Sequence, residues 1–262
     1  MVISILGCGW LGMALGRKMA QNEYFQVKGS TTTRIKLNLI EQAKIQAYLL
    51  DLSDHSPDDF FLCDVMVVTI PPSIPLFREK IKKVIEQLEN HKVKKVVFVS
   101  TTSVYPNLNR EVVERDAEYI KSQHSGVTML SIEDQFRNCT GFQTTIIRFA
   151  GLYGPGREPG RFLAGKSNLR GAQSPVNLIH QDDCVEIISE IIKQNVWGET
   201  LNACSDVHPT RKEFYKKAAL VREFEPPTFS DQSASFKIVS SEKLKSVLNY
   251  SFIHPNPIDS IK

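Results

Sequence analysis

The chain has 262 residues, of which 42% are hydrophobic, and its formal net charge at pH 7 is +3. This length accommodates one large α/β domain or a larger domain with a smaller appendage, and the apolar fraction is ample for a buried core. The small, dispersed positive charge argues against a nucleic-acid partner, and no segment is long and apolar enough to cross a membrane. We therefore expect a globular chain that neither binds nucleic acid nor spans a bilayer.

The five cysteines are scattered and lack C-x-x-C spacing. That distribution is typical of reduced thiols and predicts neither a disulfide framework nor a zinc site, so no metal site is predicted. A strand pattern already begins at Val2, and a signal or transit peptide would remove that strand. We therefore expect a cytoplasmic protein.

Strand-like and helix-like segments alternate over the first 150 residues. The predicted strands are Val2–Leu6, Phe25–Thr31, Ile45–Leu50, Val65–Ile70, Val96–Ser100 and Thr144–Phe149. The predicted helices are 10–21, 33–43, 75–90 and 127–139. Alternation at this spacing predicts right-handed βαβ crossovers and hence an α/β fold with a doubly wound parallel sheet.

The composition of the chain changes after residue 150, and the predicted elements become shorter. Residues 151–160 are rich in glycine and proline, and further prolines punctuate shorter elements up to Pro257. We predict a larger domain over 1–150 and a smaller C-terminal substrate lobe over 151–262, partly interleaved with the first. Ligands of such sheets bind beyond the carboxyl ends of the strands, so we expect a cleft there.

The first predicted strand ends in a G-x-G-x-x-G turn formed by Gly7, Gly9 and Gly12, and a helical pattern starts directly after it. Gly7 permits a tight turn, Gly9 allows a pyrophosphate to approach the backbone, and Gly12 lets the helix pack closely on the strand. The helix N-terminus adds N–H donors and a partial positive charge. The pattern predicts a Rossmann-type domain that binds a dinucleotide. Cys8 within the turn is interpreted as a small packing residue or as a thiol shielded by the cofactor.

The residues after the second strand favour NADP, with NAD as the alternative cofactor. NAD-specific sites usually carry Asp or Glu about 20 residues beyond the glycines, whereas no carboxylate appears here before Glu41. Ser30, Thr31 and Arg34 offer the donors that a 2′-phosphate needs. The alternative for Arg34 is a solvated residue of the next helix. Asp51, after the third strand, either bonds the adenine amino group or caps a turn.

The predicted cofactor contacts come from the glycine turn and from the ends of the strands. They are Gly7, Gly9, Trp10, Leu11, Gly12, Ser30, Thr31, Arg34, Asp51, Ile70, Pro71 and Ser100. All of them stand where a doubly wound sheet places its ligand.

Further motifs resemble the extended short-chain dehydrogenases/reductases. Residues 100–106, Ser-Thr-Thr-Ser-Val-Tyr-Pro, are similar to the S-[ST]-x-x-V-Y-G segment of those enzymes, and 148–156 are similar to their R-x-x-x-x-Y-G-P-G stretch. Residues 177–183 resemble their H-x-D-D segment, and Leu201-Asn-Ala resembles their Y-N-V strand. Since these motifs keep the family's order along the chain, it is identified as similar to the NAD-dependent epimerase/dehydratase family. The glycine spacing and short length resemble the atypical branch of that family.

The resemblance implies that the usual catalytic pair is missing. In active members a Tyr-x-x-x-Lys pair exchanges a proton with the substrate and holds the cofactor's ribose. The Lys normally stands four residues before a Glu, which we place at Glu133, so the two positions hold Ser125 and Met129. A non-standard or water-borne acid would then be needed. His124 neighbours Ser125 and could supply a proton, and its alternative is a loop histidine without a catalytic role.

Other residues implied by the resemblance concern the substrate. Thr101 matches the family's Ser or Thr that bonds the substrate oxygen, and its alternative is a hydroxyl that caps a turn. Tyr105 is expected to shape the cleft against the substrate. Arg157, Arg161 and Lys166 lie in a glycine-rich loop and either clamp an anionic substrate such as a nucleotide sugar or form a solvated basic loop.

The H-x-D-D segment is expected to have structural roles. His180 is expected to bond the backbone at the domain junction. Asp182 and Asp183 are expected to stabilise the N–H groups of the helix that follows them.

Three hypotheses for the function follow. The first is a reductase or epimerase that acts on a small anionic or sugar-like substrate, with Thr101 polarising a carbonyl. The second is a catalytically inactive dinucleotide sensor or scaffold, which the residues at the Tyr and Lys positions favour. The third, a structural protein with an empty cleft, fits poorly with so complete a phosphate turn. The helices 75–90 and 127–139 resemble the pair that dimerises many family members, so a homodimer is also predicted.

Overall fold

The computed structural model describes residues 1–53, 57–117 and 126–261. The chain forms two compact units that are interleaved along the sequence. The first takes in Met1–Ser100, Thr128–Ile147 and Val185–Thr200, and the second takes in Thr101–Val127, Arg148–Cys184 and Leu201–Lys262. The predicted division at residue 150 stays a prediction. Over the described ranges, no helix combines the length and the apolar character that a bilayer crossing requires.

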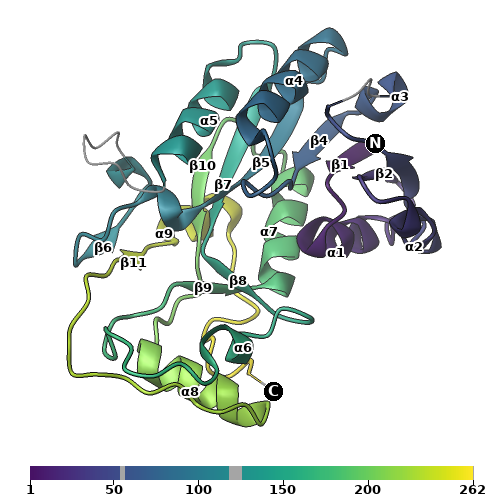
Figure 1. The fold of residues 1–262 in the computed structure, drawn as a ribbon. Coiled ribbons are helices and arrows are strands. Elements are labelled where there is room, and N and C mark those ends of the chain that lie inside the picture. Colours follow the sequence, from purple (N-terminus) through teal and green to yellow (C-terminus); the bar gives the residue numbers. More distant parts are fainter. Residues whose placement is uncertain (54–56, 118–125, 262) are drawn as a thin grey trace. The chain divides into compact units, whose positions relative to one another are not determined.

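A seven-stranded parallel sheet is the central element of the fold, with the strand order β10-β7-β5-β4-β1-β2-β3 (Figure 1). Its strands are β1 (Val2–Leu6), β2 (Gln26–Thr31), β3 (Gln46–Leu49), β4 (Val65–Val68), β5 (Lys95–Thr101), β7 (Gln143–Phe149) and β10 (Thr200–Ala203). β1 lies between β2 and β4 and runs parallel to both. The direction of strand addition reverses beside β1, and such a switch point is where doubly wound sheets bind ligands. The predicted fold class is confirmed.

Helices cover the sheet and explain why its central strands are mostly apolar and buried. They are α1 (Trp10–Met19), α2 (Leu37–Gln42), α3 (Asp58–Phe61), α4 (Phe77–Asn90), α5 (Val127–Asn138) and α7 (Gln181–Lys193). Figure 1 shows α1 and α7 side by side, and Lys18 Nζ lies 2.9 Å from a Glu186 carboxylate oxygen across them. α4 and α5 are also neighbours, and Arg78 donates to the Thr128 hydroxyl over 3.1 Å. When helices cover both faces of a parallel sheet, the side chains on either face of each strand are buried, and such strands are therefore rich in Val and Ile.

The second unit is built from short elements. They are β6 (Glu111–Val112), β8 (Gly151–Tyr153), α6 (Gly160–Leu163), β9 (Leu178–His180), α8 (Arg211–Val221), β11 (Ile238–Val239) and α9 (Glu242–Leu248). β8 pairs in parallel with β9, and β6 pairs in parallel with β11. Tyr153, Leu178 and Phe214 form a buried apolar cluster that ties β8 and β9 to α8. Val176, Tyr215, Ile258 and Ile261 pack against this small core and are partly buried.

The predicted elements of the first unit recur with small shifts at their ends. β5 extends one residue further at each end than the predicted Val96–Ser100. The predicted helix 33–43 is divided into a 3-10 helix, η1 (Arg34–Lys36), and the short α2. Thr33 is extended there, with φ −118° and ψ 112°, so a regular helix cannot begin before Arg34.

The glycine turn fixes how closely α1 approaches the sheet. A Cβ built on Gly12 would lie 2.3 Å from the carbonyl oxygen of Gly7, which is closer than any relaxed contact allows. Gly7 has a φ of +102°, a region that side chains other than glycine's strongly disfavour. A Cβ on Gly9 would instead meet no atom within 4 Å. The first and third glycines are therefore required by the fold itself, whereas the second is not.

We expect Gly12→Ala to lower the free energy of unfolding by about 1–3 kcal/mol, because the added methyl group forces α1 away from the turn. Gly9→Ala is the matched control, and we expect it to change stability by no more than about 1 kcal/mol, since its φ of −81° suits alanine. Urea denaturation followed by circular dichroism measures both. Equal losses in the two variants would contradict this account of the turn.

Candidate functional site

The glycine turn presents the start of α1 to solvent. Gly9 is exposed at the N-cap position of α1 and has no side chain with which to cap the helix. An uncapped helix N-terminus carries N–H donors and a partial positive charge, and both suit an anion such as a phosphate. Because the space in front of Gly9 is open, the turn is a candidate site for a diphosphate.

Ser30 and Thr31 close β2 beside the turn. The Ser30 hydroxyl accepts a hydrogen bond from the Gly7 N–H over 3.0 Å, and the Ser30 carbonyl accepts one from the Cys8 N–H over 2.7 Å. The Thr31 hydroxyl accepts from the Thr33 N–H over 3.2 Å. Both hydroxyls therefore shape the backbone, and each retains an O–H that can donate to a ligand.

Arg34 lies just beyond these hydroxyls, exposed at the start of η1. Its guanidinium offers planar, permanently charged donors of the kind that bind phosphate groups. The next carboxylate along the chain is Glu41, in α2. The end of β2 thus combines hydroxyl and guanidinium donors without a neighbouring acidic side chain in the sequence.

Thr69 supports the turn from the neighbouring strand, and sequence reasoning missed it. Its hydroxyl donates to the Gly7 carbonyl over 2.7 Å, directly after β4. A Cβ on Gly12 would lie 2.9 Å from the same hydroxyl. In the sequence, the feature that could have indicated this role is a single hydroxyl residue directly after a run of buried apolar residues. Ile70 and Pro71, both predicted cofactor contacts, follow Thr69 and are half-buried and exposed respectively.

Cys8 packs into the sheet rather than facing solvent. It is buried, and a Cβ on Gly29 of β2 would lie 2.5 Å from its Sγ. Burial raises the pKa of Cys8 to about 12, so the thiol stays protonated at neutral pH. Trp10 is half-buried and Leu11 is buried in the first turn of α1. These positions fit the interpretation of Cys8 as a small packing residue.

Asp51, after β3, makes a turn and an ion pair. Its Oδ1 accepts from the Lys80 ammonium over 2.9 Å and from the Ser53 N–H over 3.0 Å. The Lys80 hydrogen bond, followed by those from Ser53, lowers the pKa of Asp51 to about 2. The bond from the Ser53 N–H is the contact expected of a residue that caps a turn. A bond from an adenine amino group would have to use the same ionised carboxylate.

Ser100 ties the end of β5 to α5. Its hydroxyl donates to Glu133 Oε1 over 2.6 Å, and both residues are buried. Met129 lies four residues before Glu133 and is buried on the same face of α5. The side chain at the position assigned to the family's Lys is therefore apolar and enclosed. Ser125 and His124 lie outside the described residues.

Thr101 begins the second unit as the N-cap of the 3-10 helix η2 (Thr102–Val104), where its hydroxyl accepts from the Ser103 N–H over 3.2 Å. Tyr105, directly after η2, is buried in a polar network. It donates to Asn202 Oδ1 over 2.6 Å and accepts from Arg148 Nη1 over 2.7 Å. Burial raises the pKa of Tyr105 to about 12, so its hydroxyl is neutral. Both Thr101 and Tyr105 make structural contacts, and a substrate role for either stays a prediction.

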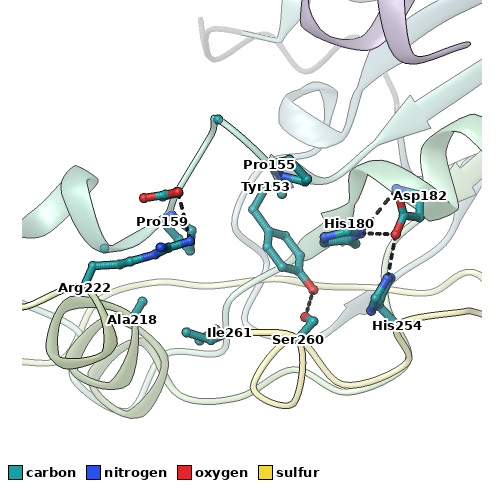
Figure 2. Close-up of a pocket in the computed structure, with 14 residues that line it drawn as sticks. Tyr153, Pro155, Pro159, His180, Asp182, Ala218, Arg222, His254, Ser260 and Ile261 are labelled. Atoms are coloured by element: carbon teal, nitrogen blue, oxygen red, sulfur yellow. Dashed lines mark hydrogen bonds and ion pairs between the residues drawn. The ribbon is translucent and has the colours of Figure 1, made fainter. Parts of the chain in front are cut away.

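A pocket of about 460 Å³ lies in the second unit, beside the glycine-rich loop after β8 (Figure 2). The loop supplies backbone and prolines to its wall, while Arg157, Arg161 and Lys166 are exposed and do not line it. The cation that does line the pocket is Arg222, which pairs with Glu158 over 2.9 Å. Arg222 is separated from the loop by about 60 residues, and no motif pointed to it.

Three side chains meet at the other side of this pocket. His180 Nδ1 accepts from the Asp182 N–H over 3.2 Å and lies 3.3 Å from Asp182 Oδ2. His254 Nε2 lies 3.0 Å from the same oxygen. Burial, and then the neighbouring His254, lower the pKa of His180, which favours its neutral ring. Sequence reasoning noted His180 and Asp182 and missed His254.

Asp183 lies in the first turn of α7, where a carboxylate was expected, and it also makes tertiary contacts that the sequence did not predict. Its buried carboxylate accepts from the Ile253 and His254 N–H groups over 2.7 and 3.0 Å and from the Tyr250 hydroxyl over 2.8 Å. It thus anchors the segment after α9 from the first turn of α7. The residues that it anchors lie about 70 positions further along the chain.

Comparisons with known proteins agree with this architecture. A model of the NAD dependent epimerase/dehydratase family matches residues 80–204. Protein YeeZ of Escherichia coli (strain K12) is 30% identical over 269 residues, which cover 98% of this chain and 97% of YeeZ.

Two solved structures are similar over almost the whole chain. A functionally unknown conserved protein from Silicibacter pomeroyi DSS has a TM-score of 0.82 at 19% identity, covering 99% of this chain and 96% of that one. UDP-glucuronic acid 4-epimerase from Bacillus cereus, in complex with NAD, has a TM-score of 0.80 at 18% identity, covering 100% of this chain and 96% of that one. At identities this low, the two structures establish a shared fold.

We expect Tyr105→Phe to lower the free energy of unfolding by about 1–3 kcal/mol, because it removes the buried hydroxyl that donates to Asn202 Oδ1 and accepts from Arg148 Nη1. Tyr24→Phe is the control, since Tyr24 is exposed, and we expect a change within about 0.5 kcal/mol. Urea denaturation compares the two. If Tyr105→Phe were as stable as the parent protein, the buried network would not need this hydroxyl, and its substrate role would gain support.

Proposed function

Because the chain belongs to the NAD-dependent epimerase/dehydratase family, we propose that it binds NADP in preference to NAD and reduces or epimerises a small anionic or sugar-like substrate. The observation that carries the proposal is the geometry of the glycine turn, where exposed Gly9 opens the N-terminus of α1 to an anion. A pyrophosphate in that place would accept from the first N–H groups of the helix. The nicotinamide dinucleotides share this pyrophosphate, so the turn supports either cofactor.

The preference for NADP rests on the end of β2. The 2′-phosphate distinguishes NADP from NAD, and Arg34 and the O–H groups of Ser30 and Thr31 are donors for it. An acidic residue would hold the ribose hydroxyls of NAD and repel that phosphate. The related UDP-glucuronic acid 4-epimerase has NAD in its solved complex, so the predicted preference sets this chain apart from that protein.

The substrate class is proposed from the second unit and from the relatives. The similar epimerase acts on a UDP-linked sugar acid, and this chain has exposed cations at Arg157, Arg161 and Lys166 and a further one, Arg222, in the pocket wall. Guanidinium and ammonium groups bind carboxylate and phosphate oxygens. We therefore propose an anionic substrate, with a nucleotide sugar as the first compound to test.

The proposed chemistry relies on Thr101 and on an acid other than the family's Tyr. Thr101 would donate its hydroxyl proton to a substrate carbonyl, because the bond from Ser103 uses only the oxygen's acceptor capacity. Met129, which we assign to the family's Lys position, supplies no ammonium that could lower the pKa of a neighbouring acid. A water molecule or another side chain would then supply the proton.

The second candidate function is a dinucleotide sensor without turnover, and buried, apolar Met129 is the observation that favours it. Two assays distinguish the two functions: conversion of a panel of UDP-sugars to their epimers in the presence of NADP⁺, and deuterium transfer from labelled NADPH to a panel of UDP-keto-sugars, whose carbonyl accepts the hydride. For an enzyme, Thr101→Val should lower the rate by about 10²–10³-fold, whereas Thr101→Ser keeps the hydroxyl and should retain most of it. Neither epimerisation nor transfer with any member of the panels, with NADPH bound, would favour the sensor.

We expect Arg34→Ala to weaken NADPH binding by about 10- to 100-fold and to leave NADH binding within about twofold, because a charge-assisted bond to the 2′-phosphate is worth about 1.5–3 kcal/mol. Calorimetric titration of both cofactors measures this. Arg17→Ala is the control, since it removes a cation in the last turn of α1, away from the turn. Equal affinity for NADH and NADPH, unchanged in Arg34→Ala, would contradict the NADP assignment.

We expect Gly9→Ala to weaken binding of NADPH and NADH alike by about tenfold or more, because its methyl group occupies the space a pyrophosphate needs. Since this variant is expected to fold normally, the loss would report on the ligand contact alone. The control is Ala14→Gly in the middle of α1, which changes helix stability without altering the turn. Cofactor affinity that survives in Gly9→Ala would place the diphosphate elsewhere.

A further inference from the structure

We propose that His180, Asp182 and His254 form a binding site for one divalent transition-metal ion of the zinc class, with its open side toward the pocket of the second unit (Figure 2). The site is independent of the dinucleotide turn, which belongs to the first unit. His180 ends β9, Asp182 lies in the first turn of α7, and His254 follows α9. Two parts of the chain, the β9–α7 junction and the segment after α9, thus bring metal-binding atoms within 4.8 Å of one another.

The spacing of the three side chains matches shared coordination. Two atoms bound to one tetrahedral zinc ion at about 2.0–2.1 Å lie about 3.3–3.4 Å apart. Asp182 Oδ2 lies 3.3 Å from His180 Nδ1 and 3.0 Å from His254 Nε2. The same carboxylate oxygen is therefore the common neighbour of both rings. Small rotations of these side chains would place all three atoms around one ion.

The hydrogen bond at His180 shows that one ring nitrogen carries no proton. His180 Nδ1 accepts from the Asp182 N–H over 3.2 Å, and this uses its single lone pair. A metal ion at Nδ1 would replace that hydrogen bond. The Asp182 carboxylate oxygen, 3.3 Å from Nδ1, would be a second ligand for the same ion and so favours the exchange.

Buried Asp183 holds His254 in place. The Asp183 carboxylate accepts from the His254 backbone N–H over 3.0 Å and from the preceding N–H of Ile253 over 2.7 Å. It also accepts from Tyr250 over 2.8 Å, which fixes the start of the same segment. The His254 ring is thereby positioned before any ligand arrives, and this positioning lowers the entropy cost of binding.

The surroundings leave one side of the cluster open. Gly154 has a φ of +142°, and a Cβ there would lie 3.2 Å from His180 Nε2, so glycine makes room for the ring. Tyr153 packs edge-on against His180 at 5.1 Å, and its hydroxyl bonds Ser260 over 2.6 Å. The pocket of about 460 Å³ begins beyond them. Three protein ligands with an open fourth position are typical of exchangeable or catalytic zinc sites.

The donor set selects the class of metal. Two imidazoles and one carboxylate suit Zn²⁺, Co²⁺ and Ni²⁺. Mg²⁺ and Ca²⁺ prefer oxygen ligands alone, so neither is expected to bind here. The fourth position would take water or an oxygen atom of a small ligand in the pocket.

The test uses full-length, untagged protein dialysed against EDTA and then titrated with ZnCl₂ by calorimetry and with CoCl₂ by visible absorption. We expect one equivalent of each metal to bind, with the d–d bands of a four-coordinate Co²⁺ site. His254→Gln and Asp182→Asn should each weaken Zn²⁺ binding by about 100-fold or more, since a lost ligand should cost at least as much as a lost outer-shell partner. MgCl₂ should give no binding at the same concentrations.

The matched control is His91→Gln. It removes a histidine that also pairs with a carboxylate, Asp58 at 3.5 Å, in the other unit, and Zn²⁺ should bind it as tightly as the parent protein. If the cluster variants fail to fold by circular dichroism, the Co²⁺ spectrum of the parent protein decides the matter. No binding to the parent protein, equal binding to His254→Gln, or a thiolate-to-cobalt charge-transfer band that places the metal on a cysteine would each overturn the proposal.

Discussion

The contact between Gly12 and the Gly7 carbonyl is the constraint on which the first unit depends. No side chain fits between them, because a Cβ at Gly12 would lie 2.3 Å from that oxygen. The contact seats the N-terminus of α1 at the carboxyl end of β1. There it lies beside the ends of β2 and β4, which pair with β1 on either side. Ser30 from β2 and Thr69 after β4 then bond the same turn. The close approach of Gly12 to Gly7 therefore places the N-terminus of α1 beside the ends of β1, β2 and β4.

The first unit was predictable because its determinants are local. Three features can each be recognised within a short window: the buried runs in β1 and β4, the three glycines, and the absence of a carboxylate between the end of β2 and Glu41. Strand ends differ from prediction by a residue or two, as at β5, because pairing with a neighbour decides where a strand stops. Thr69 was missed because a hydroxyl after a strand has many possible partners. Only the fold shows that its partner is the Gly7 carbonyl.

The second unit was less predictable because its contacts join distant parts of the chain. Tyr105 bonds Asn202, 97 residues away, and Arg222 pairs with Glu158 across 64 residues. A sequence motif identifies each partner singly and does not tell which two will meet. The resemblance did locate Tyr105 and Arg148 as members of two motifs, and the structure joins them by a hydrogen bond. The motifs did not predict that Tyr105 and Arg148 would be hydrogen-bonded to each other.

Asp182 and Asp183 show how neighbouring, identical residues acquire different roles. Both lie in the first turn of α7, where the helix dipole favours a negative charge. Asp183 is fully buried and must therefore be paired, and the two N–H groups and the Tyr250 hydroxyl that it accepts from satisfy that requirement. The side chain of Asp182 is 56% exposed, so it carries no such requirement and remains available to a ligand. Buried Asp183 holds the segment that carries His254. Exposed Asp182 lies beside the rings of both histidines. The two roles differ because adjacent residues of a helix point in different directions, one into the core and one to the pocket.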